Sequence, residues 1–287
     1  MAWEIRGKNV LLTGATNGIG LEASIELARR GARMTLVGRD PQRTEAAVAD
    51  VKARSGSAEV SHLLCDFSSQ ASIRNLADEV LASHESLHVL INNAGGVNKE
   101  RRLTVDGIET TFAVNHLGYF LLTNLLLDRI IQSAPARIVT VASAAHRSGT
   151  LDFDDLGYER GYKIMRSYSR SKLANFLFAS ELARRLEGTG VTSNSLHPGV
   201  VATNIWSGAP TVAKQLIRFV FSPFFLTPAQ GAATIVQLAA SPELEEVNGK
   251  YFEKGKPVTP APLARDEGLG RRLWDVSAGM VGLQKPS

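Results

Sequence analysis

The sequence predicts an α/β fold: one domain over residues 1–287, with a doubly wound, mostly parallel, seven-stranded sheet and helices on both faces. Apolar segments of strand length alternate with helical segments, and this alternation predicts right-handed crossovers between parallel strands. Leu36-Val37 and Val89-Leu90-Ile91 are continuously apolar, as expected for strands that are covered on both faces. No repeat, low-complexity segment or linker indicates a second domain.

The expected elements follow one another in a regular order. An apolar strand at 8–13 runs into a glycine-rich turn, after which apolar residues recur at helical spacing. Asp40 followed by Pro41 is typical of an N-cap and a first helical residue, so the second helix is expected to begin there. Strands are expected near 8–13, 33–38, 59–65, 88–92, 137–142, 191–197 and 249–253. Helices are expected near 18–30, 41–54, 69–83, 107–132, 167–187, 211–221, 228–240 and 263–279.

Composition is that of a globular protein with a soluble surface, since 44% of the residues are hydrophobic and 21% are charged. The net charge of +4 is too small and too dispersed to indicate nucleic-acid binding. Residues 1–7 lack an apolar signal core, and no run of about 18 apolar residues predicts a transmembrane segment. The one cysteine, Cys65, lies in an apolar strand and is expected to be a buried, inert thiol. A reducing, cytoplasmic location is therefore expected.

The turn after the first strand predicts a phosphate-binding site. Gly14, Gly18 and Gly20 stand in the spacing G-x-x-x-G-x-G between that strand and a helix. Glycines let the backbone approach a diphosphate closely, and the start of the helix presents N–H groups and a positive dipole to it.

A tyrosine and a lysine on one helix predict proton-transfer chemistry. Tyr168 and Lys172 are four residues apart and so project from the same helix face, one turn apart. An ammonium near a phenol favours phenolate, so we expect Lys172 to lower the pKa of Tyr168. Such a tyrosine can exchange a proton with a carbonyl or alcohol oxygen near neutral pH.

With these motifs the chain resembles the short-chain dehydrogenase/reductase family from about Lys8 to its C-terminus, and the resemblance implies a Rossmann fold. The glycine motif is Thr13-Gly14-Ala15-Thr16-Asn17-Gly18-Ile19-Gly20, and the N-N-A-G signature is Asn92-Asn93-Ala94-Gly95. The resemblance implies that cofactor-binding residues are Gly14, Thr16, Asn17, Gly18, Ile19, Gly20, Asn93, Ala94, Gly95, Tyr168, Lys172, Pro198, Gly199 and Thr203. It implies that catalytic residues are Asn115, Ser143, Tyr168 and Lys172.

Three stretches resemble the retinol-dehydrogenase-like branch of that family: Ser171-Lys172-Leu173-Ala174-Asn175, Glu181-Leu182-Ala183-Arg184-Arg185-Leu186 and Arg271-Arg272-Leu273-Trp274-Asp275-Val276-Ser277. The resemblance implies reduction of a carbonyl group or oxidation of an alcohol. Tyr168 would donate the proton, and Lys172 would keep Tyr168 acidic and hold the nicotinamide ribose. Ser143 would hydrogen-bond the substrate oxygen, and Asn115 would hold a water that links Lys172 to solvent.

The end of the second strand predicts NADP(H) rather than NAD(H). The family's acidic position aligns with Gly38, and Arg39 follows it, with Arg43 one helical turn on. An arginine here suits a ribose 2′-phosphate, whereas an acid suits the free 2′-hydroxyl. Asp40 is interpreted as a helix cap. Asp66 either contacts the adenine, as in the family, or caps the helix that begins near Ser69.

The resemblance places a substrate-covering segment at about 204–227. Its apolar side chains predict a lipophilic aldehyde, ketone or alcohol as substrate; they are Trp206, Val212, Leu216, Ile217, Phe219, Val220, Phe221, Phe224, Phe225 and Leu226. Because Lys214 and Arg218 flank this segment, a helix in peripheral contact with a membrane is the alternative. His146 either lines the pocket or is structural.

The other histidines show no metal-ligand spacing, so no metal is expected. The apolar residues Leu173, Phe176, Leu177 and Phe178 either form a homodimer face or pack on the sheet. Two other functions remain open: a non-catalytic NADP(H)-binding regulator of the same fold, and a light-dependent protochlorophyllide-type reductase. The complete set of catalytic residues argues against the regulator, and the single cysteine argues against the light-dependent enzyme.

Overall fold

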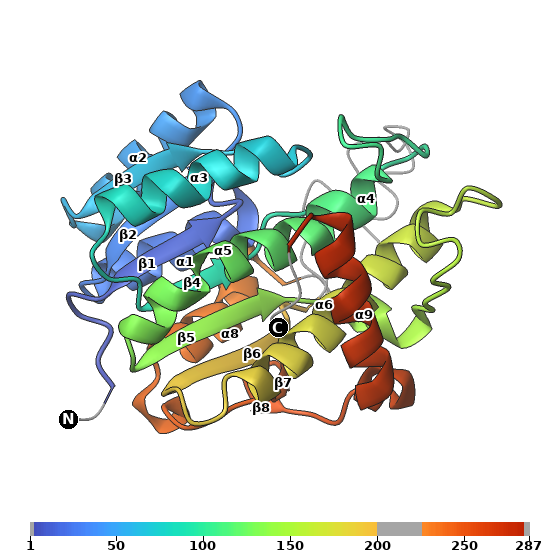
Figure 1. Ribbon diagram of the computed structural model, residues 1–287. Helices are drawn as coiled ribbons and strands as arrows, with labels where there is room; N and C mark the ends of the chain where they lie inside the picture. Colours follow the sequence, from blue (N-terminus) through green and yellow to red (C-terminus); the bar gives the residue numbers. More distant parts are fainter. Residues whose placement is uncertain (1–2, 200–225, 284–287) are drawn as a thin grey trace.

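The computed structural model describes residues 3–199 and 226–283 and has the predicted α/β architecture (Figure 1). One sheet runs through the described residues in the order β3-β2-β1-β4-β5-β6-β7-β8. Its strands are β1 (Asn9–Thr13), β2 (Arg33–Gly38), β3 (Val60–Leu64), β4 (Val89–Asn92), β5 (Ala136–Val141), β6 (Val191–His197), β7 (Tyr251–Glu253) and β8 (Lys256–Pro257). All neighbours are parallel except β7 and β8.

The strand β8 corrects the expected number of seven strands. It is a two-residue antiparallel edge strand that turns back on β7 through Lys254 and Gly255, both with positive φ. It is too short to show periodicity, and it contains Pro257, which a sheet tolerates at its edge.

The helices follow the expected order where the structure describes them, except that the one expected over 107–132 is divided into two. They are α1 (Gly18–Arg29), α2 (Pro41–Ser55), α3 (Gln70–Ser83), α4 (Thr110–Phe112), α5 (Gly118–Gln132), α6 (Ile164–Arg185), α8 (Pro228–Ala240) and α9 (Glu267–Met280). The helix expected over 107–132 begins later and is interrupted by a π-helical turn, Ala113–Leu117. The expected helix 211–221, Thr203 and nearly all of the substrate-covering segment lie outside the described residues.

Two helical layers cover the sheet. Helices α1, α2 and α8 lie on one face, over a core that includes Leu12, Leu36 and Ile91. Helices α3, α5 and α6 lie on the other face, over a core that includes Leu11 and Leu90. The alternation of Leu11 and Leu12 between the two cores is that of a strand buried on both sides.

The C-terminal helix α9 packs across α6, on the side away from the sheet (Figure 1). Trp274 of α9 stacks on Phe178 of α6 at 5.8 Å and meets Phe120 of α5 edge-on at 4.8 Å between ring centroids. Leu173, Phe176, Leu177 and Phe178 are all buried within the single chain. Of their two interpretations, packing inside the chain is confirmed, and the expectation that they form a dimer face is wrong.

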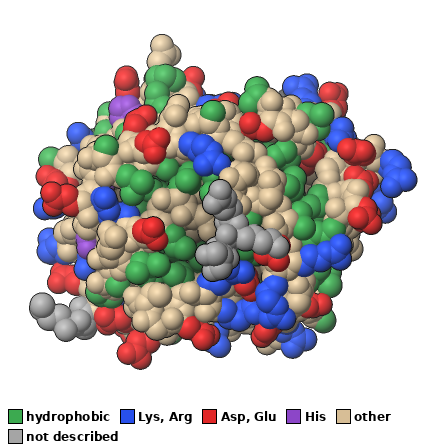
Figure 2. Space-filling model, in the orientation of Figure 1, with side chains coloured by type: hydrophobic (Ala, Val, Ile, Leu, Met, Phe, Trp, Pro, Cys, Tyr) green, Lys and Arg blue, Asp and Glu red, His purple; other side chains and the backbone are tan. Residues whose placement is uncertain are grey.

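Acidic and basic side chains are interspersed over the face of the molecule drawn in Figure 2, in keeping with the small net charge. Within residues 3–199 and 226–283, no helix combines the length and the apolar character needed to cross a bilayer.

The aromatic contacts of α9 lead to a stability prediction. Trp274→Ala removes a buried ring from between α5 and α6 and should lower the free energy of unfolding by about 3–5 kcal/mol. Urea denaturation followed by circular dichroism measures this. Asp275→Ala changes an exposed residue of the same helix and should alter stability by less than about 0.5 kcal/mol. Equal stability of the two variants would contradict the assigned role of α9.

Candidate active site

The glycine turn after β1 is packed too closely for side chains. Gly14 and Gly18 have φ of +68° and +56°, a region that L side chains rarely adopt. A Cβ on Gly14 would lie 2.7 Å from the Cα of Ala94, and one on Gly20 would overlap the carbonyl oxygen of Gly14. The turn therefore needs glycine at these positions to lie against the segment that follows β4.

Thr13 and Asn93 fix this turn to the end of β4. The Thr13 hydroxyl oxygen accepts the backbone N–H groups of Asn93 and Ala94 at 2.9 and 3.0 Å. The Asn93 amide donates to the carbonyls of Thr13 and Gly14 at 2.8 and 3.0 Å. Asn93 and Ala94 were predicted as cofactor-binding residues, whereas the role of Thr13 was missed. Its position directly before the first glycine was the signal.

The start of α1 fits a diphosphate. Asn17, the residue before α1, makes no capping hydrogen bond, and the first turn contains no acidic residue. By contrast, α2, α3, α8 and α9 are capped by the side chains of Asp40, Ser69, Thr227 and Asp266. The N–H groups at the start of α1 are thus left for an anionic ligand, which the positive end of the helix dipole favours.

The end of β2 has two cations and no room for an acid. A Cβ on Gly38 would lie 2.6 Å from Thr16 Cγ2 and would overlap the Thr44 hydroxyl. Arg39 and Arg43 are exposed and form no ion pair with the part of the chain that the structure describes. The capping role of Asp40 is confirmed, because its carboxylate accepts the N–H of Arg43 at 2.9 Å.

Asp66 does not cap α3, which removes one of its two interpretations. The cap is Ser69, whose hydroxyl accepts the N–H of Ser72 at 3.3 Å. One carboxylate oxygen of Asp66 accepts the N–H and the hydroxyl of Ser68 at 2.9 and 2.7 Å. Contact with an adenine remains a prediction.

Ser143, Tyr168 and Lys172 come together where β5 ends. Tyr168 and Lys172 lie in the first half of α6, and Lys172 Nζ donates to the carbonyl of Val141 at 3.0 Å. The same ammonium lies 5.6 Å from the ring centroid of Tyr168. Ser143 is the N-cap of a 3-10 turn after β5, and its hydroxyl acts on Tyr168 in the direction that favours phenolate. The end of β5 and the start of α6 thus bring Ser143 together with the Tyr168–Lys172 pair to form one site.

Burial governs the proton affinities of this site. It lowers the pKa of the Lys172 ammonium to about 8. It raises the pKa of Tyr168 above the ordinary value, and the hydrogen bond from Ser143 only partly opposes this. The expected net lowering of the Tyr168 pKa by Lys172 is therefore wrong for the free protein, in which burial dominates the shift. Tyr168 carries its proton at neutral pH.

Asn115 lies in the π-helical turn and holds the site together. Its side-chain amide donates to the Gly96 carbonyl at 2.9 Å and the Ser171 hydroxyl at 3.0 Å, and its oxygen accepts the N–H of Gly96 at 2.9 Å. Ser171 in turn donates to the carbonyl of Tyr168 at 2.7 Å. The segment after β4 is thereby fixed to α6. The π-helical turn and the part played by Ser171 were missed, and the water expected at Asn115 remains a prediction.

The structural interpretation of His146 is confirmed. The ring is buried and stacks on Phe176, and its Nδ1 lies 2.7 Å from the carbonyl oxygen of Ser143.

Burial raises the pKa of the Cys65 thiol to about 12, which fits an inert cysteine. Among residues 3–199 and 226–283, no group of three or more His, Cys, Asp and Glu side chains could hold a metal ion.

Pro198 and Gly199 follow β6, at the same edge of the sheet as Ser143. Gly199 has φ of +88°.

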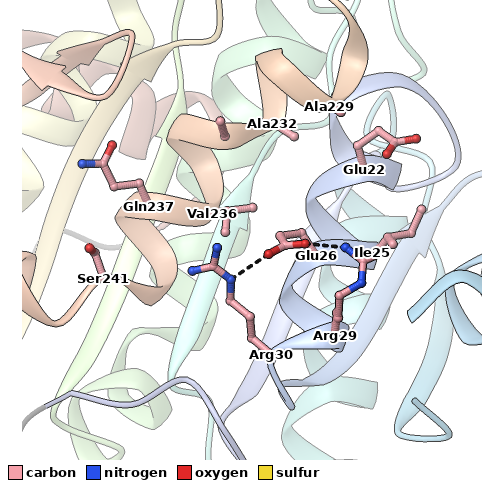
Figure 3. Close-up of a pocket in the computed structure, with 11 residues that line it drawn as sticks. Glu22, Ile25, Glu26, Arg29, Arg30, Ala229, Ala232, Val236, Gln237 and Ser241 are labelled. Atoms are coloured by element: carbon pink, nitrogen blue, oxygen red, sulfur yellow. Dashed lines mark hydrogen bonds and ion pairs between the residues drawn. The ribbon is translucent and has the colours of Figure 1, made fainter. Parts of the chain in front are cut away.

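A cavity of about 440 Å³ lies away from this site, between α1 and α8 (Figure 3). These helices cover the face of the sheet opposite to α6. The arginines of this cavity, Arg29 and Arg30, are both paired with Glu26, so it is a surface groove with balanced charge.

A dinucleotide-binding α/β fold with a serine, a tyrosine and a lysine at the edge of its sheet defines a class of oxidoreductases. The chain belongs to the short chain dehydrogenase family, whose sequence profile matches residues 8–211. Members of this family use NAD(H) or NADP(H).

Individual relatives match nearly the whole chain. Retinol dehydrogenase 14 of Homo sapiens is 46% identical over 98% of this chain and 88% of its own length. Retinol dehydrogenase 13 of Homo sapiens is 44% identical over 99% of this chain and 87% of its own length. The crystal structure of an uncharacterized protein from Mycobacterium paratuberculosis superimposes with a TM-score of 0.80 at 32% identity, covering 100% of this chain and 97% of that one. The chain thus resembles retinol dehydrogenases within the family.

The buried ammonium predicts a specific pH dependence of stability. Folded Lys172 loses its proton near pH 8, and the unfolded residue near its usual 10.5. Between these values the unfolded state binds more protons, so the contribution of Lys172 to stability rises with pH. Relative to Lys172→Met, the wild-type free energy of unfolding should increase by about 3 kcal/mol from pH 8 to pH 10.5. Urea denaturation at a series of pH values measures this, and parallel curves for the two proteins would refute it.

Proposed function

We propose that this chain is an NADP(H)-dependent oxidoreductase that interconverts a lipophilic aldehyde or ketone and its alcohol. The observation that carries the proposal is the convergence of Ser143, Tyr168 and Lys172 beside the glycine turn. These side chains provide a proton donor, a nearby cation and a second hydroxyl at the edge where a dinucleotide binds.

In the direction of reduction, Tyr168 protonates the substrate oxygen. Burial keeps the phenol neutral in the free protein, so Tyr168 carries the proton that it donates in this step. The reduced nicotinamide of a cofactor whose diphosphate is held at the glycine turn would supply the hydride. As Tyr168 becomes phenolate, Lys172 stabilises the new negative charge. Ser143 orients the substrate oxygen through the hydroxyl that it points at Tyr168.

The preference for NADP(H) rests on the end of β2. Arg39 and Arg43 supply positive charge there, and the packing around Gly38 leaves no space for the acid that would bind a free ribose hydroxyl. The glycine turn and the uncapped start of α1 would hold the diphosphate.

The substrate class rests on two observations. The relatives are named as retinol dehydrogenases, and retinol is a lipophilic alcohol. The sequence at about 204–227, where the family covers its substrate, is rich in aromatic and aliphatic residues. A lipophilic substrate is thus proposed, with peripheral membrane contact of this segment as a route by which it could be reached.

Removal of the Tyr168 hydroxyl tests the reaction. Tyr168→Phe should lower kcat for NADPH-dependent reduction of apolar aldehydes by about 100- to 10,000-fold, because a general acid contributes that much. NADPH binding, followed by fluorescence, should survive. Tyr251→Phe is the matched control, since it removes a tyrosine hydroxyl that bonds Glu253 on β7. Tight NADPH binding by wild-type protein with no turnover across the aldehydes would instead favour a nucleotide-binding regulator.

Charge reversal at the end of β2 tests the cofactor. Arg39→Asp should raise the Kd for NADPH by about 10- to 100-fold, which corresponds to the loss of a charge-assisted contact, and leave that for NADH nearly unchanged. Isothermal titration calorimetry measures both. Arg33→Asp makes the same charge change at the opposite end of β2 and should leave both constants unchanged. Equal losses for NADPH and NADH in Arg39→Asp would rule out a contact with the 2′-phosphate.

A further inference from the structure

A second buried tyrosine, Tyr119, lies beside the catalytic lysine. It stands in the first turn of α5, directly after the π-helical turn that contains Asn115. Its side chain is fully buried, and its hydroxyl has no hydrogen-bond partner. The Lys172 ammonium lies 6.0 Å from its ring centroid, so the ammonium stands near both tyrosine rings. A buried, unpaired hydroxyl costs about 1–3 kcal/mol, and something has to compensate it.

Two more unpaired polar atoms lie on the adjoining strands. Asn92 of β4 and Thr140 of β5 are register neighbours, and both are fully buried. Their side chains point to the face of the sheet that α5 and α6 cover, because Leu90 and Ile138, two residues earlier, belong to the core on that face. Asn92 Oδ1 and Thr140 Oγ1 have no partner. Asn92 is tied to α5 by its amide, which donates to Thr123 at 3.0 Å, one helical turn after Tyr119.

The Lys172 ammonium needs acceptors on this side. It has three N–H donors, and its one hydrogen bond within the described residues goes to the Val141 carbonyl. The titratable groups around it are Tyr168 on the same helix, Tyr119 on α5 and His197 at the end of β6. Burial is the cause that lowers its pKa, and no described carboxylate offsets this. Neutral acceptors are therefore required.

We propose that Tyr119, Asn92 and Thr140 bind buried water that hydrogen-bonds the Lys172 ammonium, and that Tyr119 is thereby a positioning residue for proton transfer. A buried water needs two to four polar partners, and α5, β4 and β5 offer three unpaired atoms in addition to the ammonium of α6. The water would accept from Lys172 and donate to Asn92 Oδ1, which satisfies both groups. The catalytic part of this inference rests on the proposed function, whereas the water site itself does not.

The first test needs no substrate. In protein labelled with ¹³C at the lysine Cε, NMR titration gives the pKa of Lys172. The signal of Lys172 is identified by its absence from the spectrum of Lys172→Met. Tyr119→Phe retains the ring and removes the hydroxyl. The pKa of Lys172 should fall by about a further half unit, because the ammonium loses the water that solvates it. Thr140→Val, a similar-sized change on the strand side, should move it in the same direction, and Tyr251→Phe should leave it unchanged. A Lys172 pKa that is unmoved in both Tyr119→Phe and Thr140→Val would overturn the proposal.

The second test is the pH profile of alcohol oxidation with NADP⁺. Oxidation needs Tyr168 as phenolate, which the charge of Lys172 favours, so Tyr119→Phe should shift the profile to higher pH and lower kcat near neutral pH by about threefold. If Tyr119→Phe changes only the stability of the protein, and both the pH profile and the Lys172 pKa stay as in the wild type, then Tyr119 is merely a core residue and the proposal fails. If wild-type protein turns over no alcohol or carbonyl, the proposed function fails, and the NMR titration still decides whether the water site exists.

Discussion

A lysine ammonium is buried under α6 and held by a single backbone carbonyl, and much of the architecture serves to keep it there. Removing a charge from water is unfavourable, so the helix that carries Lys172 has to be anchored by other contacts. Apolar side chains supply them: α6 packs on the sheet with one face and against α9 with another, and most of its residues are buried. The Asn115–Ser171–Tyr168 hydrogen bonds then fix the start of the helix against the segment after β4.

The topology of the sheet explains why the groups meet. The chain runs outward from β1 to β3 and then returns to form β4 on the other side of β1. The segments after β1 and β4 therefore diverge at the point where the strand order reverses, which is where open α/β sheets bind ligands. Thr13 and Asn93 join the segments after β1 and β4 here by four hydrogen bonds. Ser143 and Gly199 follow neighbouring strands and reach the same edge.

The sequence was most informative where backbone chemistry restricts residue type. Glycines at a close approach, an aspartate before a helix proline, and a tyrosine and lysine one turn apart were all recognisable, and so was the alternation that defines the sheet. The direction of the Tyr168 pKa was not, because desolvation depends on packing around the hydroxyl that spacing does not report. The π-helical turn, Ser171 and Tyr119 were missed for the same reason: each acts through neighbours that only the folded chain brings together. The burial of Phe178 depended on Trp274 of α9, which is far away in sequence.

The position of α9 also has a consequence for biosynthesis. All of the described residues assigned to chemistry precede Pro228, yet the helix that bears Tyr168 and Lys172 is covered on its outer side by residues near the C-terminus. A chain still attached to the ribosome would have made its whole reaction centre while Phe178 remained exposed to water. Completion of this apolar layer has to await translation of α9. Nascent chains are thus expected to present an aromatic surface to chaperones until α9 has been made.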